Sequence, residues 1–107
     1  MTNDSSTTGS SLPSDSELRP VLSIFKAISD PSKMRIILLI AHQALSVSDI
    51  TAQLSISQSA VSHHLQTLRQ LNLVTNVRVG REMHYQVTDQ HVLQIFELTR
   101  KHVREEN

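Results

Sequence analysis

The sequence contains no cysteine. Disulfides, thiolate metal sites and cysteine nucleophiles are therefore excluded. Aromatic residues make up only 3% of the 107 residues, namely Phe25, Tyr85 and Phe96, so the core has to be built from Leu, Ile and Val. An aliphatic core in so short a chain gives limited stability, and a second copy of the chain would add buried surface.

The chain also lacks a long apolar run and the pattern of a signal peptide, so we expect a cytoplasmic protein with no membrane partner. Ten basic and ten acidic residues give a formal net charge of zero, which argues against a nonspecific nucleic-acid binder. The charge is unevenly placed, however, because only one of four charged residues in the stretch 50–88 is acidic: Arg69, Arg78, Arg81 and Glu82. A basic contact face is therefore compatible with the sequence.

Residues 1–16 are Ser, Thr, Asn, Asp and Gly almost throughout, a composition that predicts a disordered tail. Residues 17–107 are predicted to form one domain. A first helix is indicated from Glu17 by apolar residues at helical spacing: Leu18, Val21, Leu22, Phe25 and Ile28. Asp30 and Pro31 predict the start of a second helix that runs to about His42, with an apolar face of Met34, Ile37, Leu38 and Ala41.

Two short helices follow with a tight turn between them. Ser46 and Asp49 match the capping pattern at the start of the third helix, whose buried residues are predicted to be Val47, Ile50 and Leu54. Ser57 is expected to cap the fourth helix, which ends near Leu71 and buries Val61, Leu65 and Leu68. Two helices joined in this way, the second unusually polar, are typical of a helix-turn-helix that reads DNA.

The segments 74–79 and 83–87 are short, β-branched or alternating, and they flank Gly80 and Arg81. This pattern predicts a β-hairpin, and a last helix is expected from about Asp89 to Arg104. Four helices, a hairpin and a closing helix predict a mainly α fold, the winged helix-turn-helix.

The fourth helix is predicted to face DNA. With its three apolar residues in the core, short polar and amide side chains point away, and these suit base edges and phosphates. The hairpin tip adds two arginines that can reach phosphates or the minor groove. An ordinary exposed helix is the alternative, but it would carry Glu/Lys pairs that are absent here. The candidate DNA-binding residues are Ser57, Gln58, Ser59, Ser62, His63, Gln66, Arg69, Arg78 and Arg81.

Three segments resemble the ArsR/SmtB family: residues 28–36, 54–65 and 80–85. The run S-Q-S-x-V-S-H-H-L from Ser57 to Leu65 is the most specific of them, and the similarity extends over about residues 18–105. The resemblance implies a homodimeric winged-helix repressor that leaves its operator when it binds a metal ion. Some family members carry a Cys-x-Cys metal site in the third helix. Here Ser46 and Ser48 stand at those positions, and serine is a poor ligand for arsenic, cadmium or lead.

The closing helix offers a different metal site. His91, Ile95, Leu98, His102 and Glu105 fall on one face, and Asp89 precedes them. The two histidines are about 16 Å apart along a helix, so one ion cannot bridge them within one chain. In an antiparallel partner helix, Asp89 and His91 of one chain would meet His102 and Glu105 of the other. This spacing is similar to that of the closing-helix site of the family. Two imidazoles and two carboxylates suit Zn²⁺, or Co²⁺ in the same geometry, and Ni²⁺ ranks lower because it prefers more ligands.

The sequence thus predicts a repressor that binds operator DNA as a homodimer and is released by Zn²⁺ or Co²⁺. A metal-bound imidazole has a second nitrogen that can donate to a backbone carbonyl, and residues 71–73 at the end of the fourth helix are the expected acceptors. The main alternative is a regulator of the same fold that responds to a signal other than metal. A protein-interaction module without a DNA role is a second alternative. An enzyme is not expected, because the four ligands leave no open position for a substrate and the chain has only two glycines, neither in a phosphate-binding loop.

Overall fold

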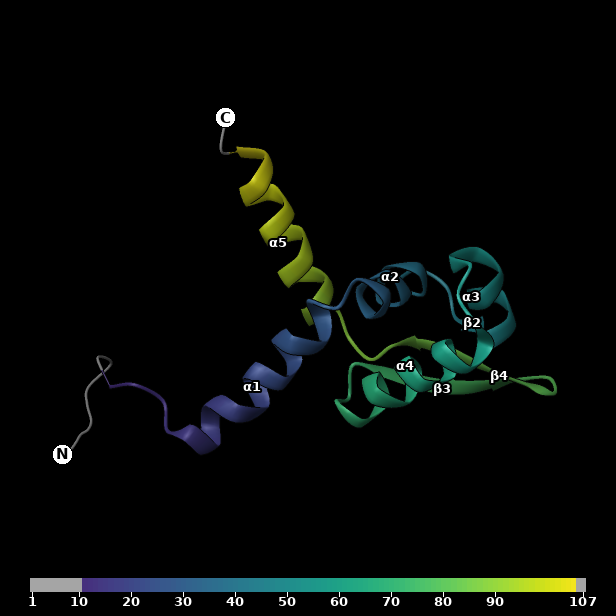
Figure 1. Ribbon diagram of the computed structural model, residues 1–107, viewed down its shortest axis with the longest axis horizontal. Helices are drawn as coiled ribbons and strands as arrows, with labels where there is room; N and C mark the ends of the chain where they lie inside the picture. The colour runs from purple at the N-terminus through teal and green to yellow at the C-terminus, as the bar shows by residue number, and fades with distance from the viewer. Residues whose placement is uncertain (1–10, 106–107) are drawn as a thin grey trace.

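The computed structural model describes residues 11–105 and has the predicted order of elements (Figure 1). Within that range the helices and strands are Asp15–Ile28 (α1), Pro31–Leu39 (α2), Leu45–Ser46 (β2), Val47–Leu54 (α3), Gln58–Gln70 (α4), Val74–Val79 (β3), Glu82–Val87 (β4) and His91–Glu105 (α5). The predicted mainly α fold with a hairpin is therefore confirmed.

Helix α1 begins two residues before Glu17, where the sequence pattern placed its start. The reason is a capping box: the Glu17 N–H donates to Ser14 Oγ at 3.2 Å, and the Ser14 N–H donates to Glu17 Oε1 at 3.0 Å. Such reciprocal bonds satisfy two backbone donors at the helix end. Asp15 and Ser16 therefore belong to the helix rather than to the predicted tail, of which residues 1–10 lie outside the described range.

Helix α2 ends at Leu39, earlier than the predicted end near His42, and its burial differs from the predicted face. Ile37 is fully buried as expected, but so are its neighbour Ile36 and Ile40, which the helical spacing did not select. Met34 is only half-buried. Two adjacent buried residues require contacts on more than one side, and α2 does pack against α1, α3 and α4.

The helix-turn-helix has the predicted caps. At the start of α3 the Asp49 N–H donates to Ser46 Oγ at 3.1 Å, and at the start of α4 the Ala60 N–H donates to Ser57 Oγ at 3.1 Å. Between them Ser55 adopts the left-handed conformation with φ 56° and ψ 39°. That conformation ends α3 and turns the chain toward α4.

The hairpin forms a sheet of three strands in the order β2-β4-β3. Gly80 takes φ +63° in the turn, a conformation that glycine adopts without a steric penalty. Strand β2 was not predicted because it has only two residues, and it pairs with β4 through Leu45 opposite Tyr85 and Ser46 opposite His84. The wing is therefore attached to the segment that starts α3.

Helices α1 and α5 extend away from the body formed by α2–α4 and the sheet (Figure 1). The radius of gyration is 17.1 Å, above the value of about 13 Å for a compact chain of this length. Within residues 11–105, no helix combines the length and the apolar character needed to cross a membrane. The buried core lies in the body and takes one residue each from the adjoining ends of α1 and α5: Ala27, Ile36, Ile37, Ile40, Leu45, Ile50, Val61, Leu65, Leu68, Val74 and Val92.

Candidate functional site

The outer face of α4 is the candidate DNA-binding surface. The predicted inner residues Val61, Leu65 and Leu68 are fully buried, with at most 1% of their surface exposed. This fixes the rotation of α4 and turns its polar residues outward. A shallow hollow on the outer face is lined by five of the predicted contact residues: Gln58, Ser59, Ser62, His63 and Gln66.

All nine predicted DNA-contact side chains are exposed in the structure. Ser57 has a structural task as well, because its hydroxyl caps α4. The helix contains no acidic residue, and Arg69 lies in its last turn. A phosphate approaching α4 therefore meets donors and one cation, without an acidic side chain from the helix itself.

Arg78 on β3 and Arg81 in the turn place two cations on the wing, whose tip extends beyond the α3–α4 pair (Figure 1). The carboxylate of the neighbouring Glu82 is in hydrogen-bond contact with the His84 ring, with 3.3 Å between Glu82 Oε1 and His84 Nε2. The net charge of the tip is therefore basic, which is suited to the phosphates beside a groove.

His64 lies on the opposite side of α4 from this surface, as its predicted position at the border of the core requires. Its Nδ1 is buried and has no hydrogen-bond partner among the described residues. Burial lowers the pKa of His64 below 6.5, and the charge of Lys33 lowers it further. Asp30 lies close by and caps α2, and the Lys33 N–H that it accepts at 2.9 Å lowers the pKa of its carboxyl. His64 therefore favours its neutral form and is part of the packing between α2 and α4.

The predicted metal ligands occupy the two ends of α5. Asp89 begins the helix by accepting the His91 N–H at 2.9 Å, and the same oxygen lies 3.2 Å from His91 Nδ1. These two side chains therefore already lie together, and Oδ2 of Asp89 takes part in neither contact. His102 and Glu105 lie one turn apart at the other end.

Within one chain these four residues do not meet. Among the described residues, no group of three or more His, Asp or Glu side chains lies close enough to hold a metal ion. Each end of α5 nevertheless supplies one imidazole and one carboxylate, half of the donor set that tetrahedral zinc prefers. The donor chemistry fits zinc, provided that a second copy of α5 completes each half.

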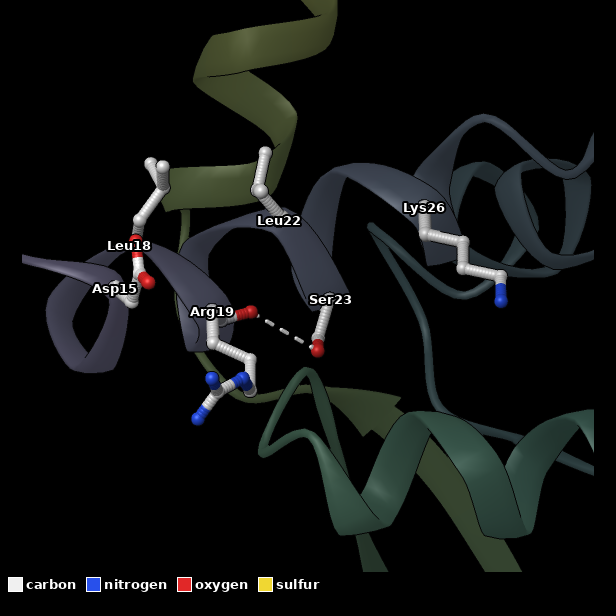
Figure 2. Close-up of a pocket in the computed structure, with 6 residues that line it drawn as sticks. All are labelled: Asp15, Leu18, Arg19, Leu22, Ser23 and Lys26. Atoms are coloured by element: carbon white, nitrogen blue, oxygen red, sulfur yellow. Dashed lines mark hydrogen bonds between the residues drawn. The ribbon is translucent and has the colours of Figure 1, made fainter.

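Large apolar side chains are left exposed on α1 and α5. On α1 they include Val21, Leu22 and Phe25, each about half exposed, and on α5 they include Leu98, at 72% exposed, and Val103, at 60%. Figure 2 shows that Leu18 and Leu22 point to one side of α1, away from Arg19. Along this helix a shallow groove is lined by Asp15, Leu18, Arg19, Leu22, Ser23 and Lys26. Exposed apolar side chains grouped on two neighbouring helices make this a candidate interaction face.

Comparison with known proteins identifies the regulator type. Residues 30–76 match the family model described as bacterial regulatory protein, arsR family. The chain is 41% identical over 81 residues to a transcriptional repressor SmtB homologue from Synechocystis, an alignment that covers 76% of this chain but only 61% of that protein. It is 38% identical over 88 residues to the HTH-type transcriptional regulator NmtR of Mycobacterium tuberculosis, covering 81% of this chain and 73% of the relative.

The fold is also that of a solved structure, the homodimeric winged helix-turn-helix DNA-binding domain of Mb0332 from Mycobacterium bovis. The two superpose with a TM-score of 0.77 at 24% identity, over 92% of each chain. The predicted winged helix-turn-helix is thereby confirmed. The relatives are regulators and a repressor, in agreement with the prediction that the chain is not an enzyme.

Proposed function

The chain belongs to the ArsR family of bacterial transcriptional regulators, and on that premise we propose that it is a metal-responsive repressor. It binds operator DNA as a homodimer and releases it when Zn²⁺, or Co²⁺, binds between the α5 helices of the two subunits. The observation that carries this proposal is the division of the ligands: Asp89 and His91 lie in contact at one end of α5, and His102 and Glu105 at the other. A DNA target implies that the protein acts in the cytoplasm.

The second copy of the chain is supported by the exposed apolar residues of α1 and α5. Leu98 lies on the face of α5 that also carries His91 and His102. Packing two such faces against each other in antiparallel orientation buries the apolar middle and brings each half of the donor set to its complement. The M. bovis structure of the same fold is described as homodimeric, which supports a second copy of the chain as the partner.

Bound metal would supply a link between the two subunits. The chain contributes the orientation of the ligands: the Asp89 carboxylate is fixed by the His91 N–H, and α5 fixes the spacing of His102 and Glu105. The carbonyls of residues 71–73 are the expected acceptors for the second N–H of a bound imidazole. That of Leu73 already accepts the Thr88 N–H at 3.0 Å, and its second lone pair can accept another.

The metal proposal predicts that the dimer takes up about two zinc ions with submicromolar affinity, because two symmetric four-ligand sites form. His102→Ala should lose this binding and should stay on the operator when zinc is added. Equilibrium dialysis and operator-release titration measure the two effects, with exposed His42→Ala as a matched control. Zinc uptake by His102→Ala equal to that of the wild type would contradict the proposed site. Failure of the wild-type dimer to take up zinc would favour the alternative, a regulator of the same fold that responds to a signal other than metal.

The DNA surface makes a separate prediction. Arg81→Ala should weaken binding to all duplex sequences and reduce its salt dependence, because it removes a phosphate contact. Gln58→Ala should instead cost about 1–3 kcal/mol on the operator and relax sequence preference. Fluorescence anisotropy on operator and scrambled duplexes at several salt concentrations separates the two. Unchanged affinity in both variants would contradict the assignment of α4 and the wing as the contact surface. A wild-type protein without salt-dependent affinity for either duplex would favour the alternative, a protein-interaction module.

A further inference from the structure

The C-terminal end of α5 places its proposed metal ligands among basic side chains. The proposed ligands His102 and Glu105 have three basic residues close to them in the sequence: Arg100, Lys101 and Arg104. Cations at the C-terminal end of a helix interact favourably with the negative end of the helix dipole and stabilise the helix. The same cations repel a divalent metal ion, so the partners of each one determine its effect on the site.

Arg100 is engaged away from the ligands. Its guanidinium donates to both carboxylate oxygens of Glu97 at 2.6 Å, and it lies 5.2 Å from the centre of the Phe96 ring. Because a carboxylate lies directly against it, most of its charge is balanced, and it turns back toward the middle of the helix.

Lys101 is engaged with a ligand itself. Its Nζ lies 3.9 Å from Oε2 of Glu105, and the two side chains are 71% and 62% exposed. They are four residues apart on the same helix, so the pair forms within one subunit and does not depend on the partner. The ammonium group therefore lies at the carboxylate that the metal has to use.

We propose that Lys101 competes with zinc for the Glu105 carboxylate and thereby sets the zinc concentration at which the operator is released. This inference rests on the proposed function of α5 as the metal site. An exposed ion pair is weak, so the metal displaces the ammonium rather than being excluded by it. Breaking the pair opposes metal binding by up to about fivefold in affinity, and only this part depends on Glu105. The displaced ammonium, about 7 Å from a divalent ion in water, repels it as well, so that the total effect is about threefold to tenfold.

The experiment measures the zinc affinity of the metal-free dimer in competition with a chromophoric chelator, at low salt and at high salt. Lys101→Gln should bind zinc about three to ten times more tightly than the wild type at low salt, and the difference should shrink at high salt because the charge is screened. Operator release should move to lower zinc by the same factor. Lys101→Arg keeps the charge and should match the wild type, and Arg100→Gln should change the affinity little.

A second measurement tests whether Lys101 acts through Glu105. In a Glu105→Gln background, adding Lys101→Gln should raise the zinc affinity by a clearly smaller factor. Thermal unfolding of each metal-free variant checks that the fold is unchanged, as expected for a side chain so exposed.

The outcomes separate the inference from the function. If the wild type binds zinc, His102→Ala does not, and Lys101→Gln has wild-type affinity at low salt, the inference on Lys101 is overturned while the metal site stands. If Lys101→Gln gains the same factor with and without Glu105, competition for that carboxylate is overturned. If the wild type takes up no zinc, the proposed function fails and the inference fails with it.

Discussion

Among single residues, His64 is the one whose environment opposes its charge. Its Nδ1 is buried without a partner, and Lys33 lies near it on α2. Both effects lower its pKa in the folded protein, so protonation is easier in the unfolded chain. Above the ordinary value of 6.5 both states are neutral, and no dependence on pH arises from this group. As the pH falls below 6.5, the unfolded state takes up the proton first and stability is lost.

We therefore predict that His64→Gln reduces the loss of stability between about pH 7.5 and about pH 5. Urea unfolding of the metal-free protein at several pH values measures it. Gln66→Ala, at an exposed position on the same helix, is the control, because it neither adds nor removes a titrating group, and it should keep the wild-type dependence on pH. The interval avoids Asp30, whose lowered pKa removes stability only further down the pH scale, below its ordinary 3.8. Identical pH profiles for His64→Gln and the wild type would contradict the assignment.

For single residues, the sequence predicted which way a side chain points better than it predicted which side chain lies next to it. The helical phase of Val61, Leu65 and Leu68 was enough to predict which side chains of α4 are exposed, since burial of a stripe fixes the opposite face. The ion pair of Lys101 with Glu105 was not predicted, because the spacing of residues along a helix does not determine which exposed charged side chains turn toward each other. Which residues contact DNA or metal stays a prediction, since exposure alone does not test contact.

Among the elements, the turn between α3 and α4 depends on one strained residue. Ser55 has φ 56°, a left-handed conformation that costs a residue with a Cβ atom about 1 kcal/mol and glycine almost nothing. We predict that Ser55→Gly raises the free energy of unfolding by about 0.5–1 kcal/mol, as measured by urea denaturation.

The control for this turn is Ser59→Gly in the first turn of α4, where the helical conformation gives glycine no advantage and stability should fall by up to about 1 kcal/mol. A decrease in the Ser55→Gly variant as well would mean that the serine side chain outweighs the backbone strain. Operator affinity should change little with Ser55→Gly, because that residue is not among the predicted contacts.

The elements themselves were predicted well wherever a cap or a long period marked them. Ser46, Ser57 and Asp30 each begin a helix at the expected place. Strand β2 was not predicted, because two residues are too few to show an alternating pattern and its partner β4 is distant in sequence. The early start of α1 was not predicted, because Ser14 lies among similar polar residues and the sequence does not show which of them caps the helix.

The whole molecule presents more apolar surface than its own core can cover. Phe25 and Leu98 are exposed although the body of the protein is well packed, and the proposed second subunit would bury them. We predict that Leu98→Glu, which places a charge in the middle of the α5 face, shifts the protein to monomers and weakens operator binding at least tenfold, because two linked contacts become single ones. Sedimentation at several protein concentrations and operator titration measure both effects.

Gln43→Glu is the matched control, since it adds the same charge at an exposed position between α2 and β2 and should stay dimeric. A Leu98→Glu variant that remains a dimer would place the contact between subunits elsewhere. The arrangement of the whole molecule was the hardest feature to predict from the sequence. A period shows that a face is apolar, but whether a neighbour within the chain covers it depends on how α1 and α5 leave the body (Figure 1).

Ser46 belongs to two parts of the molecule at once. Its backbone bridges His84 of the wing, and its hydroxyl receives the N–H that starts α3. The wing and the helix pair cannot shift past each other without breaking this junction, so we expect the predicted DNA contacts of α4 and the wing to move together within one subunit. In the proposed homodimer, a metal ion at α5 would then act on the separation and tilt of two such units. The proposed function therefore implies that the sensed signal can change over evolution while the spacing between the two halves of the operator is kept.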